Sequence, residues 1–134
     1  MTPPDLFLYE YAVIRYVPRV DREEFINIGL VMMCKRQKWL KGEVELNEAK
    51  LRAIDVWVNL EKLRHQTGFF KRQDVPTPDI PVEEKYRWLT AVKSAVIQTS
   101  PSHPGWINLE NSDSKDPRQV LEQEFSRLFH DLVL

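Results

Sequence analysis

Two apolar strands joined by a short polar connection, between Tyr9 and Cys34, constrain the fold of this chain more than any other feature. Pro18 marks the end of the first strand, because proline cannot donate a ladder hydrogen bond. Successive side chains of a strand point to opposite faces, so the even positions of the second strand should pack against the core. Those even positions are all apolar: Ile26, Ile28, Leu30, Met32 and Cys34. The odd positions are apolar too, apart from Asn27 and Gly29, and such a strand sits inside a sheet covered on both sides or near an interface.

Asn27 and Gly29 interrupt the apolar pattern, and two interpretations are open. A glycine inside a strand is typical of a β-bulge or of a close approach between backbones, and we favour this interpretation. Alternatively, the Asn27 amide holds Arg15 or Glu23 in a polar pocket, and Gly29 makes room for a ligand or a partner's backbone. Two interpretations are also open for Arg15: it forms an ion pair with Glu23 or Glu24 across the hairpin end, or it recognises a carboxylate or phosphate.

The segment after the hairpin predicts a third strand followed by a helix. Alternation of apolar and polar residues from Trp39 to Leu46 is typical of a half-buried antiparallel strand, so three consecutive strands form a meander. Asn47 is the predicted N-cap of a helix. Apolar residues continue at helical spacing to about His65, and Gly68 is expected to end the helix.

The second half of the chain predicts two more helices. Pro81 suits the first turn of a helix that runs to about Val92, and residues 100–105 are expected to form a turn. Asp116 caps a C-terminal helix whose apolar stripe should pack on the sheet. The predicted class is therefore α+β: a small antiparallel sheet with helices packed mainly on one face. That sheet is a three-strand meander, with residues 95–99 left open as a fourth strand.

The composition is that of an ordinary globular protein. With 134 residues, the chain is expected to form a single domain over residues 1–134. It has 43% hydrophobic and 29% charged residues. No apolar run approaches the length of a membrane span, and the first residues lack a signal-peptide pattern. The single cysteine, Cys34, cannot form an internal disulfide, so we expect a cytoplasmic protein without membrane association.

Basic residues are concentrated in the middle of the chain. Residues 35–72 hold ten lysines and arginines against five acidic residues, whereas residues 74–134 hold six against ten. The surplus is compatible with nucleic-acid binding, but it is mixed with acids and lacks the aromatic spacing of single-strand binders. A solvated face is therefore the favoured interpretation. The nucleic-acid alternative would rest on Lys35, Arg36, Lys38, Lys41, Arg64, Lys71 and Arg72.

Residues that could carry catalysis or bind a metal are scattered. His65, His103 and His130 are far apart in the sequence and have no ligand-like spacing with Cys34 or with a carboxylate cluster. Cys34 follows two methionines at the end of an apolar strand, which is more typical of a core residue than of a nucleophile. The four glycines form no phosphate-binding loop or nucleophile elbow. We therefore predict no metal and no cofactor, and we favour a protein that is not an enzyme.

One order of residues in the hairpin is distinctive: Tyr9-x-Tyr11, Ile14-Arg15-Tyr16, Pro18, Arg22-Glu23-Glu24 and Asn27-Ile28-Gly29-Leu30-Val31. A second set follows later: Arg87-Trp88-Leu89, residues 97–101, and the tail from Phe125 to Val133. Over most of the chain these residues resemble the bacterial domain-of-unknown-function family 3037. The resemblance implies a small, whole-chain α+β domain with no assigned catalytic residues. Because members are often encoded beside a HipA-like kinase, it also implies a role with a protein partner.

Three functional hypotheses follow, in order of preference. The first is a protein-interaction or accessory module, with a HipA-like kinase as a candidate partner, because interfaces favour the aromatic residues that this chain holds in surplus. The second is the nucleic-acid-binding protein described above. The third is a small-ligand site or enzyme built on Arg15, Glu23 and Asn27. The residues expected to bind a ligand or partner are Arg15, Arg19, Arg22, Glu23, Asn27 and Arg87.

Overall fold

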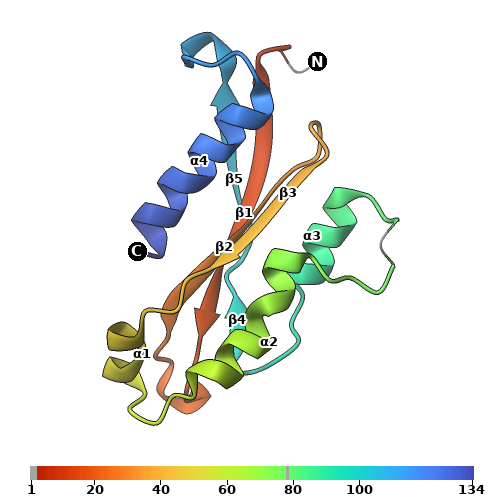
Figure 1. Ribbon diagram of the computed structural model, residues 1–134. Helices are drawn as coiled ribbons and strands as arrows, with labels where there is room; N and C mark the ends of the chain where they lie inside the picture. The colour runs from red at the N-terminus through yellow and green to blue at the C-terminus, as the bar shows by residue number, and fades with distance from the viewer. Residues whose placement is uncertain (1–2, 78) are drawn as a thin grey trace.

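The sheet is antiparallel and is built around one long strand. The computed structural model describes residues 3–77 and 79–134. Its strands are β1 (Leu6–Tyr16), β2 (Ile26–Cys34), β3 (Trp39–Val44), β4 (Ile97–Thr99) and β5 (His103–Asn108). β1, β2 and β3 follow one another across the sheet (Figure 1), which confirms the predicted meander. The other edge of β1 pairs with β5 along its first half and with β4 along its second half.

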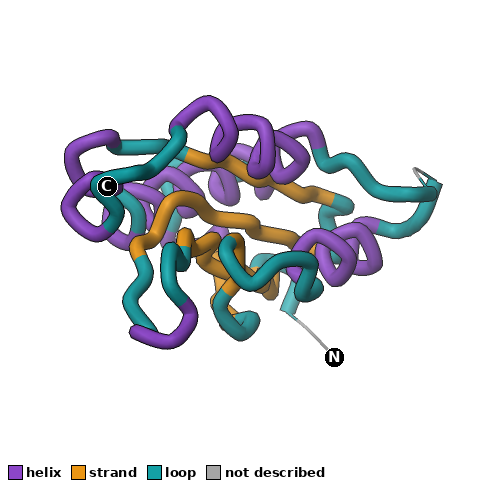
Figure 2. The backbone as a smooth tube through the Cα atoms, turned by 90° about the horizontal axis from the view of Figure 1, so that it is seen from below, coloured by secondary structure: helices purple, strands orange, loops and turns teal. Residues whose placement is uncertain are grey.

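Helices cover both faces of this sheet. They are α1 (Glu48–Ile54), α2 (Leu60–Arg72), α3 (Val82–Thr90) and α4 (Pro117–Leu132), with short 3-10 turns η1 (Val20–Arg22) and η2 (Leu109–Asn111). α1, α2 and α3 pack on one face and α4 packs on the other, and Figure 2 shows helices on both sides of the strands. The predicted α+β class with helices mainly on one face is confirmed, with α4 as the helix on the opposite face. No helix in the described residues is long and apolar enough to cross a membrane.

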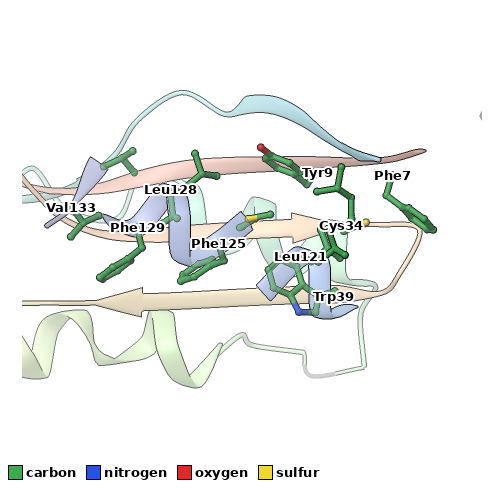
Figure 3. Packing of buried hydrophobic residues seen from close by; sticks show 14 of the residues in the cluster. Phe7, Tyr9, Cys34, Trp39, Leu121, Phe125, Leu128, Phe129 and Val133 are labelled. Carbon is green, nitrogen blue, oxygen red and sulfur yellow. The ribbon is translucent and has the colours of Figure 1, made fainter. Parts of the chain in front are cut away.

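α4 begins and packs as the sequence predicts. The Asp116 carboxylate accepts a hydrogen bond from the backbone N–H of Arg118 at 3.1 Å, which caps the helix. Leu121 and Phe125 are buried against the sheet, beside Cys34 (Figure 3). Burial raises the pKa of the Cys34 thiol, so this residue has the environment of a core side chain rather than of a nucleophile.

β2 is apolar on both faces because both faces are covered. Leu30 and Met32 belong to the core beneath α4, whereas Val31 and Met33 belong to the core beneath α1, α2 and α3. Of the two explanations open for this strand, the doubly covered position within the sheet is confirmed. Its apolar character therefore gives no independent argument for an interface.

The strict alternation predicted for β2 is wrong at Ile28. The pairing with β1 passes from Ile14 opposite Gly29 to Arg15 opposite Asn27, so Ile28 is the extra residue of a β-bulge. The bulge shifts the alternation by one residue, and Ile28 therefore joins the core under α1, α2 and α3 instead of the core under α4.

Gly29 lies where another strand comes very close. A Cβ atom at this position would lie 2.5 Å from the carbonyl oxygen of Glu43 in β3 and 2.9 Å from Cδ1 of Ile14. Both alternatives of the favoured interpretation, the bulge and the close backbone approach, are confirmed here. The space over Gly29 is filled by the chain's own atoms.

The single helix predicted over residues 47–65 is wrong, because the chain breaks it over residues 55–59. The Asn59 side chain accepts a hydrogen bond from the backbone N–H three residues later at 3.0 Å, so it starts a second helix. Gly68 does not end that helix either. α2 continues for another turn until Gln73 takes a left-handed conformation with φ 57°.

The turn predicted over residues 100–105 is wrong in its second half, where His103 begins β5. Pro104 lies in this strand, and proline is compatible with an edge strand; among the described strands, β5 pairs with β1 alone. The fourth strand left open over residues 95–99 is confirmed as β4, and the helix predicted from Pro81 is confirmed as α3.

Candidate functional site

Several predicted site residues lie together at one end of the sheet, which we call the hairpin end. It comprises the β1–β2 connection (residues 17–25), the pair Arg15 and Asn27, the α1–α2 connection (residues 55–59) and residues 133–134. Strand direction brings these segments together, because β1 ends where β2 begins and β3 ends beside the start of β2. In Figure 1 the β1–β2 connection and α1 lie at the lower end of the sheet.

Arg15 and Asn27 are direct cross-strand neighbours in β1 and β2. The Asn27 Nδ2 donates to the carbonyl oxygen of Leu132 at 2.9 Å and so ties β2 to the end of α4. In the described residues, two buried side-chain polar atoms have no hydrogen-bond partner, Nε of Arg15 and Oδ1 of Asn27. One is a donor and the other an acceptor, which is the pair of functions that a water molecule or a peptide group satisfies.

The Arg15 guanidinium stacks on the exposed ring of Phe25. Its Cζ lies 4.3 Å from the ring centroid, which is within the range of a cation–π interaction. Phe25 is 47% exposed, so the stack forms part of the surface at the hairpin end. The ion pair predicted between Arg15 and Glu23 or Glu24 is absent from the described residues, since Arg22 pairs with Glu24 at 2.7 Å.

The β1–β2 connection is held by local ion pairs. Arg19 pairs with Asp21 at 2.6 Å, and its hydrogen bonds lower the pKa of the Asp21 carboxyl. Arg19 and Arg22 are exposed, and exposed ion pairs of this kind contribute little to stability. Glu23 is exposed and has a left-handed backbone, with φ 53°, at the end of η1. These side chains shape the connection but do not converge on Arg15 and Asn27.

The α1–α2 connection contributes a tryptophan that falls within the helix predicted over residues 47–65. Trp57 is 88% exposed, and Val56 beside it is also exposed. The Asp55 carboxylate accepts a hydrogen bond from the Trp57 backbone N–H at 3.1 Å and another from the Tyr16 hydroxyl at 2.6 Å. The presence of Asp55 and Asn59, two residues that commonly bind nearby backbone N–H groups, was the available signal for a break here.

The Tyr16 contact joins the two connections. Burial, together with the hydrogen bond to Asp55, raises the pKa of Tyr16 to about 12. A small cavity of about 130 Å³ lies between the start of β2, α1 and the last residues of the chain, and Asn27, Lys50 and Leu134 are among its lining residues. Lys50 Nζ donates there to the main-chain oxygens of Val133 at 3.3 Å and Leu134 at 2.6 Å.

Arg87 lies away from the hairpin end. It lines a cavity of about 130 Å³ together with Leu8, Glu10 and Glu83, beside the first half of β1. Arg15 is seven residues further along β1 than Leu8, which at about 3.3 Å per residue is more than 20 Å. The structure therefore separates Arg87 from the other predicted site residues.

The basic residues proposed for nucleic-acid binding mostly face acidic partners. Lys41 pairs with Glu122 at 2.6 Å, and Lys71 pairs with Glu43 at 3.4 Å. Arg72 pairs with Asp74 at 2.8 Å and Lys35 with Glu83 at 3.9 Å. These contacts reduce the free positive charge that a phosphate backbone would require.

The remaining basic residues have separate surroundings. Arg36 donates to the Leu6 carbonyl oxygen at 2.7 Å and stacks on Phe7 with its Cζ 4.2 Å from the ring centroid. Lys38 occupies the β2–β3 turn with a left-handed φ of 49°. Arg64 is exposed on α2, beside His65. Arg36 and Lys38 therefore lie in the β2–β3 turn, whereas Arg64 lies on α2.

Acid–base and metal-binding side chains do not converge in the described residues. No group of three or more histidine, cysteine, aspartate or glutamate side chains is placed to hold a metal ion there. His65 and His130 are exposed on different helices, and His103 is exposed on β5, where its ring centroid lies 5.3 Å from that of Tyr11.

Comparison with known proteins identifies one family. Residues 11–133 match the family model described as "Protein of unknown function (DUF3037)". The match confirms the resemblance seen in the sequence and spans the hairpin end. No curated protein and no solved structure matches the chain.

Proposed function

Since this chain belongs to the DUF3037 family, whose function is unknown, we propose a role from its surface: a protein-interaction module that docks a partner through the hairpin end. The observation that carries the proposal is the number of exposed apolar side chains on the segments of this end. Of the eight large hydrophobic residues that are exposed in the described part of the chain, five lie there: Val20, Phe25, Val56, Trp57 and Leu134. Single exposed hydrophobic residues are ordinary on a protein surface, whereas clusters mark binding sites.

Trp57 is the strongest candidate for the centre of this interface. Tryptophan is enriched among the residues that dominate binding energy, because it buries a large area at a small cost in side-chain entropy. Phe25 offers a second aromatic ring, which the Arg15 guanidinium already supports from one side. An arginine stacked on an aromatic ring is also typical of interface composition.

The unpaired atoms of Arg15 and Asn27 support a protein as the partner. An N–H donor and an amide oxygen acceptor on neighbouring strands complement the C=O and N–H of a peptide group. Both atoms are shielded from solvent, so a partner would reach them only by displacing a neighbouring side chain. Nucleic-acid binding receives less support, because the basic residues of the middle segment lie beside acids or are dispersed.

A binding measurement with matched tryptophan variants tests the proposal. The bait is a purified HipA-like kinase, the partner class suggested by the family resemblance, titrated by calorimetry with the wild-type chain. Trp57→Ala should weaken binding at least about tenfold, as expected for a central aromatic residue. Trp106→Ala is the control, because Trp106 is 54% exposed on β5, at the opposite end of the sheet.

The outcomes are distinct. Equal affinity of wild type and Trp57→Ala would remove the hairpin end as the docking surface. Loss of binding in Trp106→Ala alone would move the interface to β5. Absence of binding to the kinase, together with nucleic acid that co-purifies at low salt and leaves at high salt, would favour the nucleic-acid alternative.

A further inference from the structure

A larger cavity lies outside the hairpin end, and we call it the α2–β4 cavity. It is enclosed by the second half of α2, the connection between α3 and β4, and β4 itself, and has a volume of about 420 Å³. This volume is within the range of small-molecule sites, which are mostly apolar with a few convergent polar groups. The apolar lining consists of Phe69, Phe70, Leu89, Val92 and Ile97.

Lys93 supplies the only cationic side chain among the described lining residues. Its Nζ lies 4.2 Å from the ring centroid of Trp88 and 5.6 Å from that of Phe69. It donates to the main-chain carbonyl oxygens of Trp88 and of Ala91, the latter at 3.1 Å. These oxygens end α3, so capping that helix accounts for two of its three N–H donors.

The Lys93 ammonium has no anionic partner in the described part of the chain. No carboxylate there lies within ion-pairing distance of Nζ, whereas Lys35, Lys41 and Lys71 each have one. Although Lys93 as a residue is exposed, partial loss of water around the ammonium lowers its pKa. An ammonium without a counter-charge in the described residues, at the edge of an apolar cavity, is a site at which an anion is stabilised.

The other polar groups at the rim also favour a ligand that accepts hydrogen bonds. The Ser94 Oγ accepts from the backbone N–H of Val96 at 3.0 Å and from that of Ile97 at 3.4 Å, which leaves its own hydroxyl proton to donate. Gln66 adds an exposed amide to the lining. The polar part of this cavity is therefore richer in available donors than in charged acceptors.

We propose that the α2–β4 cavity binds a small amphipathic monocarboxylate, with its apolar body against Phe69, Phe70 and Ile97 and its carboxylate at Lys93. One ammonium matches one negative charge, whereas a doubly charged phosphate would leave a charge uncompensated beside apolar side chains. The site is separate from the hairpin end, and its occupation does not depend on the protein-interaction role.

Octanoate is a suitable probe, with 1-octanol as its uncharged counterpart. Thermal unfolding and calorimetric titration should show saturable binding of octanoate to the wild-type chain and weaker binding of octanol. Lys93→Met keeps much of the aliphatic stem but removes the charge, and should weaken octanoate at least about tenfold, as expected for a charge-assisted hydrogen bond. Lys62→Met, on the exposed surface of α2, should leave octanoate affinity unchanged.

Methyl NMR shows where octanoate binds. Octanoate should shift the resonances of Leu89 and Ile97, which line the cavity, and leave that of Leu121 under α4 unchanged. Should Lys93→Met fail to fold by circular dichroism, Lys93→Gln serves the same comparison. Absence of saturable octanoate binding, equal affinity in the Lys93 variant, or shifts confined to other residues would each overturn the proposal.

Discussion

Replacing Gly29 by alanine should destabilise this protein, because a neighbouring strand occupies the space that the new methyl group needs. The added Cβ would lie 2.5 Å from the Glu43 carbonyl oxygen, and real Cβ atoms essentially never approach another atom within 3.0 Å. The oxygen belongs to the backbone of β3, so relief requires β2 and β3 to separate by about half an ångström, against the close packing of a core. The Ile14 side chain lies on the same face, so the new methyl group cannot avoid the contact by moving toward β1.

The expected loss is about 1–3 kcal/mol of unfolding free energy. Overpacking a core typically costs this amount when backbone must move. Separation of the strands would also weaken the adjacent hydrogen bond from the Glu45 N–H to the Ile28 carbonyl oxygen, now 2.8 Å, which is worth about 1 kcal/mol. Against this, alanine restricts the unfolded chain and returns about 0.4–1 kcal/mol.

Urea unfolding followed by circular dichroism measures the effect. With a slope of about 2 kcal/mol per molar urea, a loss of 2 kcal/mol moves the midpoint down by about 1 M. Gly68→Ala is the matched control, because its Cβ would meet only the mobile end of the Arg72 side chain. Alanine should stabilise that helix by about 0.5–1 kcal/mol. A Gly29→Ala protein as stable as the wild type, at an unchanged slope, would refute the reasoning.

Three further changes are predicted. Tyr16→Phe should lose about 1 kcal/mol with the hydrogen bond to Asp55. Because burial raises the pKa of Tyr16 to about 12 from 10.0, the folded chain holds this proton more tightly than the unfolded chain. The wild type should therefore lose stability as pH rises from about 10 to 12, and the variant should lose less; urea titrations across that range decide. Asp116→Ala should remove about 1 kcal/mol by deleting the α4 cap, with Asp116→Asn near wild type in the same assay. Asn27→Ala removes the hydrogen bond to Leu132, which destabilises the protein, and also removes an unpaired buried oxygen, which stabilises it. The two effects should offset, so that the free energy of unfolding changes by less than about 1 kcal/mol. A loss above about 2 kcal/mol in urea unfolding would indicate an additional partner for Asn27.

Structural features could be predicted from the sequence where they depend on neighbouring residues. Asp116 followed by proline predicted the start of α4, because capping involves only the next few backbone N–H groups. The polar run between β1 and β2 likewise predicted a connection. The location of Arg15 and Asn27 at one end followed from the pairing of adjacent strands, but their unpaired atoms did not, since these depend on side-chain directions and on the end of α4.

The α2–β4 cavity and the exposed position of Trp57 were not predictable in the same way. Trp57 lies within an apolar stretch that has helical spacing, and the side chains of Asp55 and Asn59 bind backbone N–H groups where the helix breaks around it. The cavity joins α2 to the α3–β4 connection and β4, which lie about 20–30 residues later in the sequence. No local pattern encodes the distance between such segments.

The α+β class, the meander and the capped C-terminal helix could be predicted from the sequence, because strand alternation and capping act over a few neighbouring residues. The fold as a whole set the shift of register at Ile28 and the edge strand β5 that contains Pro104, and it distinguished the two explanations for the apolar faces of β2. Each of these features depends on which distant segments of the chain pack on the same face of β1 or β2. Burial of apolar surface stabilises such an arrangement only when the whole core forms.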